Sequence, residues 1–303
     1  GKQMNEFQLS ESLLTPGLKL IQNKDFKSNS DAPWFQVRPQ GTGKEEEGPT
    51  WFGSLHYSGA WKLAFDKTFN GNLQILGGIN FWDTAINLKP GKEFMTPKLS
   101  VGFTSNGPEG VSQNLSSYVR KEILPKKHRE EMRPVIFNSW YSTTDKLNEN
   151  QQIELAKTAS EVGVELFVID AGWYKVNNKS YIGLGSWEVD TIKFPNGLSP
   201  IIKNVHDLGM KFGIWVEPES IHTSSDIYRD HPDWVLRFPN RVPENQRVFL
   251  NLAKEEAYKH ILEALSKLLR ENKIDFVKWD QNNYLKSPGW PDAPAEEQRE
   301  IRI

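Results

Sequence analysis

The chain has 303 residues, of which 37% are hydrophobic and 25% charged, and its formal net charge is -2. This composition is typical of a globular chain of about two domains and excludes a disordered one. The nearly neutral charge gives no electrostatic support to nucleic-acid or membrane binding, and the lack of cysteine excludes disulfides and thiolate sites.

The first third of the chain has the pattern of antiparallel β structure. Residues 1–47 are polar, and we expect them to be irregular. Residues 48–108 contain short apolar segments separated by turn signals about every 10 residues, which predicts part of a β-sandwich domain. Residues 109–132 read as a helical linker. The expected strands are 51–57, 61–65, 73–77 and 94–103.

From residue 133 the pattern changes to alternating strands and helices. This order predicts parallel strands with helices outside, as in a (β/α)₈ TIM barrel. The expected strands are 134–137, 164–169, 211–216 and 274–279, and the expected helices are 148–162, 198–208 and 255–270.

Several of these strands end in polar side chains. Lys278, Asp280 and Asn282 alternate at the end of the fourth strand and therefore project to one side of it. Asp170 ends the second strand, and Glu217 and Glu219 end the third. Because barrel enzymes build their sites at the carboxyl ends of the strands, this edge is the predicted site.

The barrel is incomplete in this sequence. Residues 133–303 hold about four βα units, whereas a complete barrel has eight. We therefore expect the first half of a catalytic barrel, with unpaired edge strands, in a chain that is part of a longer protein. The eleven tryptophans fit a core, and also a sugar site, because indole rings stack on sugar faces.

Six motifs in order along the chain resemble glycoside hydrolase family 36, most of whose members are retaining α-galactosidases. The resemblance runs from about residue 48 to residue 284. The motifs are Arg133–Trp140, Phe167–Trp173, Lys193–Leu198, Gly209–Glu219, His231–Val235 and Lys278–Asn282.

The resemblance implies a role for each polar strand end. Asp280 matches the catalytic nucleophile, and Lys278 beside it should hold its pKa low. The residues that the resemblance implies for sugar binding are Asp170, Lys278, Asn282, Trp140, Trp173, Trp187, Glu217 and Glu219. Structural alternatives remain open for these: a helix cap for Asp170, a core ring for Trp140, and structural ion pairs for the glutamates.

Two departures from the family pattern affect the substrate and the activity that the resemblance implies. The family ends its second strand with two adjacent aspartates, and here the second is Ala171, which weakens the case for plain galactose. The family's acid/base comes from a later strand, and we assign none in this chain. We therefore expect residues 1–303 alone to hydrolyse substrates poorly.

The leading hypothesis is a retaining exo-glycoside hydrolase that cleaves terminal α-galactosyl-type residues from oligosaccharides or glycoconjugates. The alternatives are an α-N-acetylgalactosaminidase or another α-glycosidase of the family, and a truncated, non-catalytic carbohydrate-binding fragment. We expect no cofactor and no metal, because the six histidines lack paired ligand spacing. We expect neither a nucleic-acid nor a membrane partner. A homo-oligomer and the compartment, cytoplasmic or exported, stay open.

Overall fold

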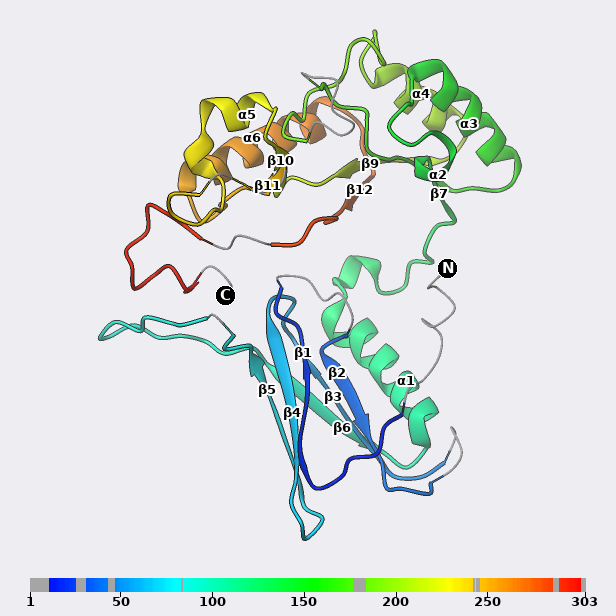
Figure 1. The fold of residues 1–303 in the computed structure, drawn as a ribbon. Helices are drawn as coiled ribbons and strands as arrows, with labels where there is room; N and C mark the ends of the chain where they lie inside the picture. The colour runs from blue at the N-terminus through cyan, green and yellow to red at the C-terminus, as the bar shows by residue number, and fades with distance from the viewer. Residues whose placement is uncertain are drawn as a thin grey trace. The chain divides into compact units, whose positions relative to one another are not determined.

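The computed structural model describes residues 11–25, 31–42, 47–82, 84–176, 184–241, 243, 246–285 and 289–300. The chain forms two compact units. One consists of Gly1–Glu131 with Pro294–Ile303, and the other of Met132–Ala293 (Figure 1). Within the described ranges, no helix combines the length and apolar character that crossing a bilayer requires.

The first unit contains two antiparallel sheets. One sheet has the strand order β1-β4-β5 and the other the order β2-β3-β6. The strands are β1 Gly17–Gln22, β2 Trp34–Val37, β3 Thr50–Leu55, β4 Trp61–Lys67, β5 Leu73–Ile79 and β6 Leu99–Thr104. Their pairing confirms the predicted antiparallel sandwich.

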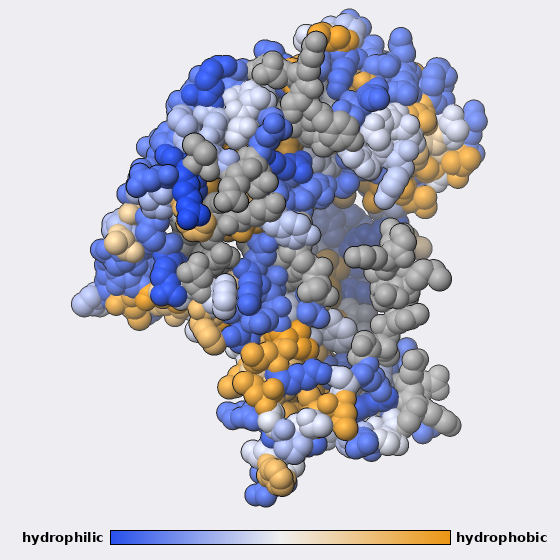
Figure 2. Space-filling view, in the orientation of Figure 1, coloured by the Kyte–Doolittle hydropathy of each residue, from blue (hydrophilic) through white to orange (hydrophobic). Residues whose placement is uncertain are grey.

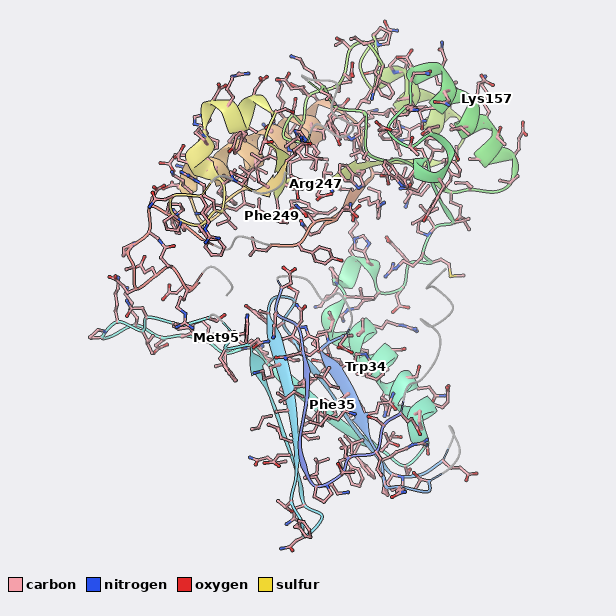
Figure 3. The ribbon with its side chains drawn as sticks, viewed as in Figure 1. Trp34, Phe35, Met95, Lys157, Arg247 and Phe249 are labelled. Carbon is pink, nitrogen blue, oxygen red and sulfur yellow. The ribbon has the colours of Figure 1, made fainter. Side chains whose placement is uncertain are left out.

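Side chains that alternate along the strands form the core between these sheets. On β2, Phe35 is buried while Trp34 is half-exposed (Figure 3). Phe35 meets Phe65 of the other sheet edge to face, with ring centroids 5.4 Å apart. The other buried members of this core are Leu55, Trp61 and Leu63. The period of two thus turns one face of each sheet inward.

The prediction that residues 1–47 are irregular is wrong for Gly17–Gln22 and Trp34–Val37. β1 pairs with β4 from Gly17 to Gln22, and β2 pairs with β3. Residues 294–300 also differ from expectation, since they lie in the first unit: the Asn87 amide donates to Glu300 Oε1 at 2.6 Å. β1 and β2 are short segments with several apolar residues inside a mostly polar stretch, whereas residues 294–300 are largely polar in sequence.

Part of the sandwich surface is hydrophobic. Figure 2 shows hydrophobic side chains gathered on the visible face of this unit. Leu18, Leu20 and Leu76 are among its exposed hydrophobic residues, and Leu20 and Leu76 flank Ala64 in the register of β1, β4 and β5. After β6 the chain forms helix α1 Gly107–Tyr118, a π-helical turn at Val119–Ile123 and a 3₁₀ turn at Lys126–His128.

The second unit is built on a parallel sheet of strand order β7-β8-β9-β12. β8 Leu166–Ile169 and β9 Lys211–Val216 are central and almost wholly buried. β7 Ile136–Asn138 and β12 Phe276–Trp279 form the edges and are more exposed. The expected strands are therefore present, and within the described residues β7 and β12 are the edge strands of this sheet.

Amphipathic helices connect the strands and lie on one side of the sheet (Figure 1). α3 Glu149–Glu161 begins at Asn148, whose side chain accepts from the Gln151 amide. In α6 Glu255–Glu271, Ile261 and Leu268 are buried and lie on the same face of the helix, about two turns apart. The remaining helices are α2 Trp140–Thr143, α4 Ser199–Asp207, α5 Asp226–Asp230 and the 3₁₀ turn Pro232–Trp234.

A second, two-stranded antiparallel sheet was not predicted. β10 Ser220–His222 pairs with β11 Arg247–Phe249 in the connection between β9 and β12. Apart from this insertion, the order of strands and helices is the first half of a (β/α)₈ barrel, preceded by part of an antiparallel sandwich.

Gly172, which follows β8, should be sensitive to substitution by alanine. Its φ is +108°, and a Cβ there would lie 2.8 Å from Asp145 Cα. Gly172→Ala should therefore destabilise the chain by more than about 2 kcal/mol, because backbone strain adds to a steric clash. Gly163→Ala is the control, since Gly163 has φ +85° but open space at its Cβ position. Equal losses in urea unfolding would contradict the steric argument.

Candidate active site

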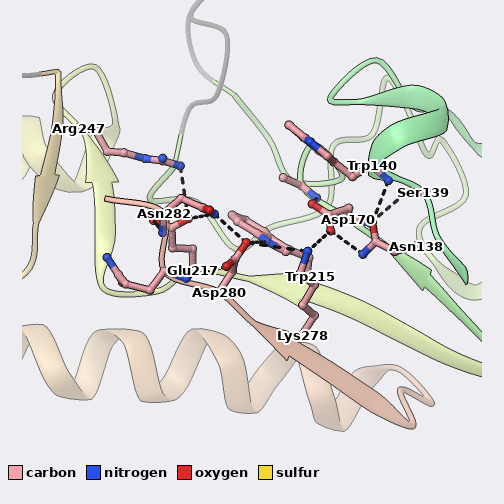
Figure 4. A network of polar contacts seen from close by, with 12 residues as sticks. Asn138, Ser139, Trp140, Asp170, Trp215, Glu217, Arg247, Lys278, Asp280 and Asn282 are labelled. Atoms are coloured by element: carbon pink, nitrogen blue, oxygen red, sulfur yellow. Dashed lines mark hydrogen bonds and ion pairs between the residues drawn. The ribbon is translucent and has the colours of Figure 1, made fainter. Parts of the chain in front are cut away.

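The carboxyl ends of the four parallel strands bring polar side chains together. Asn138 ends β7, and Asp170, Glu217 and Asp280 directly follow β8, β9 and β12. Because the strands are adjacent and parallel, residues far apart in the sequence meet at one edge (Figure 4).

Asp170 is buried and fully engaged. Its Oδ2 accepts from Lys278 Nζ at 2.7 Å and from Asn138 Nδ2 at 2.6 Å. Its Oδ1 accepts from the Ala171 amide, and its own amide donates to Ser139 Oγ. Asp170 and Lys278 thus form an ion pair that was not predicted, and this pair compensates the burial of the carboxylate.

Asp280 lies beside this pair. Its Oδ2 accepts from Trp215 Nε1 at 2.8 Å and from Asn282 Nδ2 at 2.7 Å, and its Oδ1 accepts from the Gln281 amide at 2.9 Å. Lys278 Nζ is 3.9 Å from Oδ2. Burial by itself would raise the pKa of Asp280, but the three hydrogen bonds and then Lys278 outweigh it and hold the pKa below the ordinary value.

This result refines the electrostatic prediction. The sequence assigned the low pKa of Asp280 to Lys278, whereas the hydrogen bonds from Trp215, Asn282 and the Gln281 amide contribute more. Lys278 makes its short contact with Asp170 instead. The hydrogen bonds therefore favour the ionised form of Asp280, although its nearest cation, Lys278, is bonded to Asp170.

The two glutamates after β9 contact different partners. Glu217 is buried and accepts from the Asn282 amide and side chain, with Arg247 3.4 Å away. Glu219 accepts from Trp279 Nε1 through both oxygens at 3.0 Å. Burial raises the pKa of Glu219, and the nearby Glu217 adds to the rise against opposing hydrogen bonds. Among the contacts described here, neither glutamate has a hydrogen bond to Lys278, and Glu217 instead forms an ion pair with Arg247.

The tryptophans divide between surface and core. Trp140 is half-buried at the end of β7, and its amide donates to Asn138 Oδ1. Trp173 and Trp187 are buried in the core, where they pack with Tyr174 and Trp215. The expectation that these two rings face the sugar is therefore not met, because such large rings gain more from packing under the site.

Trp215 and Arg247 belong to this network but were not predicted. Trp215 lies inside the family motif Gly209–Glu219, and its indole donates one of the hydrogen bonds to Asp280. Arg247 comes from β11, which carries only a short apolar run as its sequence signal. In the described part of the chain, no group of three or more His, Asp or Glu side chains is placed to hold a metal ion.

Strand-end carboxylates, a lysine and amides on a parallel sheet define half of an α/β barrel with its site at the usual edge. Comparison with known families matches residues 93–303 to the melibiase family and residues 1–89 to the glycosyl hydrolase family 36 N-terminal domain. The chain belongs to glycoside hydrolase family 36.

Individual relatives agree with this assignment. The chain is 35% identical to alpha-galactosidase AgaA of Geobacillus stearothermophilus over 84% of its own length and 35% of that protein. It is 32% identical to alpha-galactosidase Mel36A of Lactobacillus acidophilus, over 99% of its own length and 41% of the relative. The chain thus spans about two fifths of the curated relatives that it matches.

Solved structures show the same fold. An AgaA variant in complex with raffinose superposes with a TM-score of 0.90 at 32% identity, covering 95% of this chain and 40% of that one. Another AgaA variant in complex with stachyose gives the same score and coverage.

The Lys278 ion pair should stabilise the second unit. Lys278→Met should lower the free energy of unfolding by about 2 kcal/mol, because the buried Asp170 would lose its cation; the partial exposure of Lys278 limits the loss. Lys203→Met is the matched control, since the pair of Lys203 with Asp207 lies on the exposed surface of α4. It should change stability by less than about 0.5 kcal/mol. Similar urea-unfolding losses in both variants would refute this assignment.

Proposed function

We propose that this chain supplies the nucleophile and part of the sugar site of a retaining glycosidase that removes terminal α-galactosyl residues from oligosaccharides. The observation that carries the proposal is Asp280, a strand-end carboxylate that three hydrogen bonds and Lys278 keep ionised. The names of the relatives, which are alpha-galactosidases, support the same activity.

In this reaction an oxygen of Asp280 attacks the anomeric carbon while the bond to the leaving oxygen breaks. The leaving oxygen takes a proton from an acid, and water later releases the sugar from Asp280 with proton transfer back to that acid. The hydrogen bonds to Asp280 serve this sequence because they keep the carboxylate ionised before attack and stabilise it again as a leaving group.

Other strand-end groups are suited to hold the sugar. Lys278 Nζ has one short bond, to Asp170, and retains hydrogens for a substrate hydroxyl. Trp140 is half-buried beside Asn138 and offers an indole face for a sugar ring. We propose these two, with Asp170 and Asn282, as the sugar-binding residues in this chain.

The acid must be a different group. Asp170 accepts from Lys278 and Asn138 and is held as an acceptor, and Glu217 is paired with Asn282 and Arg247. Glu219 has a raised pKa, but Trp279 occupies both of its oxygens. We propose that the acid/base comes from the part of the family's length that lies beyond the matched span.

The nucleophile assignment predicts the effect of Asp280→Asn. In a protein that carries this chain and hydrolyses a nitrophenyl α-galactoside, the substitution should lower kcat by several orders of magnitude, because the amide cannot form the covalent intermediate. Circular dichroism and the melting temperature should stay near those of the parent. Asp207→Asn, on the exposed surface of α4, is the control and should leave kcat unchanged. Near-normal turnover in Asp280→Asn would reject the proposal.

Ala171 should change recognition around the 4- and 6-hydroxyls of the sugar. The methyl side chain is buried and cannot accept a hydrogen bond, whereas the family pattern has an aspartate there. We expect kcat/KM for an α-galactoside and its 6-deoxy analogue to differ by much less than the roughly 10⁴-fold seen when a buried polar partner is left unpaired. Strong rejection of the deoxy sugar would mean that another residue makes this contact.

A further inference from the structure

Glu217 is the most deeply buried charged group at the site. Its side chain is 0% exposed, so a substrate hydroxyl cannot reach it in this structure. Its Oε1 accepts from the Asn282 amide at 3.2 Å, and its Oε2 accepts from Asn282 Nδ2 at 3.0 Å. Arg247 from β11 supplies the compensating charge at 3.4 Å. The carboxylate thus binds Asn282 at two points.

Asn282 links this carboxylate to Asp280. Its Nδ2 donates to Glu217 Oε2 at 3.0 Å and to Asp280 Oδ2 at 2.7 Å (Figure 4). An amide nitrogen has two hydrogens, and here each faces a carboxylate. The flipped amide would turn its oxygen toward both anions and lose both bonds. The position of Glu217 therefore decides which end of the Asn282 amide meets Asp280.

We propose that Glu217 is a positioning residue that acts on Asp280 through Asn282, with Arg247 holding it in place. This rests on the proposed function of Asp280 as the nucleophile. The sequence had placed Glu217 among the sugar-binding residues, and the burial of its side chain argues for this different role.

Two effects of the Glu217 charge oppose each other, which makes the proposal testable. The charged groups around Asp280 are Lys278 on β12, Asp170 after β8, Glu217 after β9, and Arg247 on β11. Removing one negative charge from this set would by itself favour ionised Asp280 and lower its pKa. Losing the oriented Asn282 donor would disfavour the ionised form and raise it. If Glu217 positions Asn282, removing its charge should raise the pKa of Asp280, whereas simple electrostatics predicts that the pKa falls.

The test is a titration of Asp280 in this chain, followed through the ¹⁵N–¹H signal of the Trp215 indole, which donates to Asp280. The signal is assigned by its loss in Trp215→Phe. In Glu217→Gln, one hydrogen-bond donor of Asn282 meets the new amide NH₂ group, so Asn282 shifts and the midpoint should move to higher pH. Glu217→Asp keeps the charge but withdraws it by one methylene, and should move the midpoint in the same direction.

Asn282→Ala tests whether the effect passes through Asn282. The double variant Glu217→Gln with Asn282→Ala should have the same midpoint as Asn282→Ala alone. Glu219→Gln is the matched control, because Glu219 follows the same strand but binds Trp279, and it should leave the midpoint unchanged. An unchanged or lowered midpoint in the folded Glu217 variants, or additive shifts in the double variant, would overturn the proposal.

Turnover separates this inference from the proposed function. In an active protein that carries this chain, Glu217→Gln should lower kcat about tenfold with little change in KM, as expected for one displaced hydrogen bond. If the Trp215 midpoint shifts but Asp280→Asn retains turnover, the nucleophile assignment fails and the positioning role remains. If Asp280→Asn is inactive but the midpoint does not shift, the positioning role alone is wrong.

Discussion

The ion pair between Lys278 and Asp170 is the constraint on which the site depends. Asp170 is buried after β8, where an uncompensated carboxylate would be costly, and Lys278 of β12 lies 2.7 Å from it. Because β9 separates these two strands, the pair ties the end of β12 across the sheet. It also fixes where Asp280, two residues further along, can lie.

Beneath this pair, Trp215 connects the buried aromatic core to the carboxylate of Asp280. Its carbonyl accepts from Trp173 Nε1 at 2.9 Å, and its own indole nitrogen donates to Asp280. Tyr174 and Trp187 pack against its ring. A rigid aromatic layer therefore holds a donor toward the carboxylate, which is how a buried core can favour an ionised group above it. Arg247 of β11 forms an ion pair with Glu217, and Glu217 in turn accepts hydrogen bonds from Asn282.

Regular local patterns explain what could be predicted. The apolar runs that became β8 and β9 are continuous, and the face of α6 with Ile261 and Leu268 repeats at helical spacing. β1 and β2 went unpredicted because they are short apolar segments in a mostly polar stretch, and pairing with β4 and β3 is what orders them. β10 and β11 are three residues each, too short for a periodic signal.

The sequence by itself determined the class of fold, and it placed Asp280, Lys278 and Asp170 at or just after the carboxyl ends of parallel strands. These follow from strand-end position and alternation, which are properties of the local chain. Only the tertiary structure decided which partner each group takes: Lys278 bonds to Asp170, Trp215 and Asn282 to Asp280, and Arg247 to Glu217. Such pairings depend on distances between strands, and those distances are set by packing across the sheet.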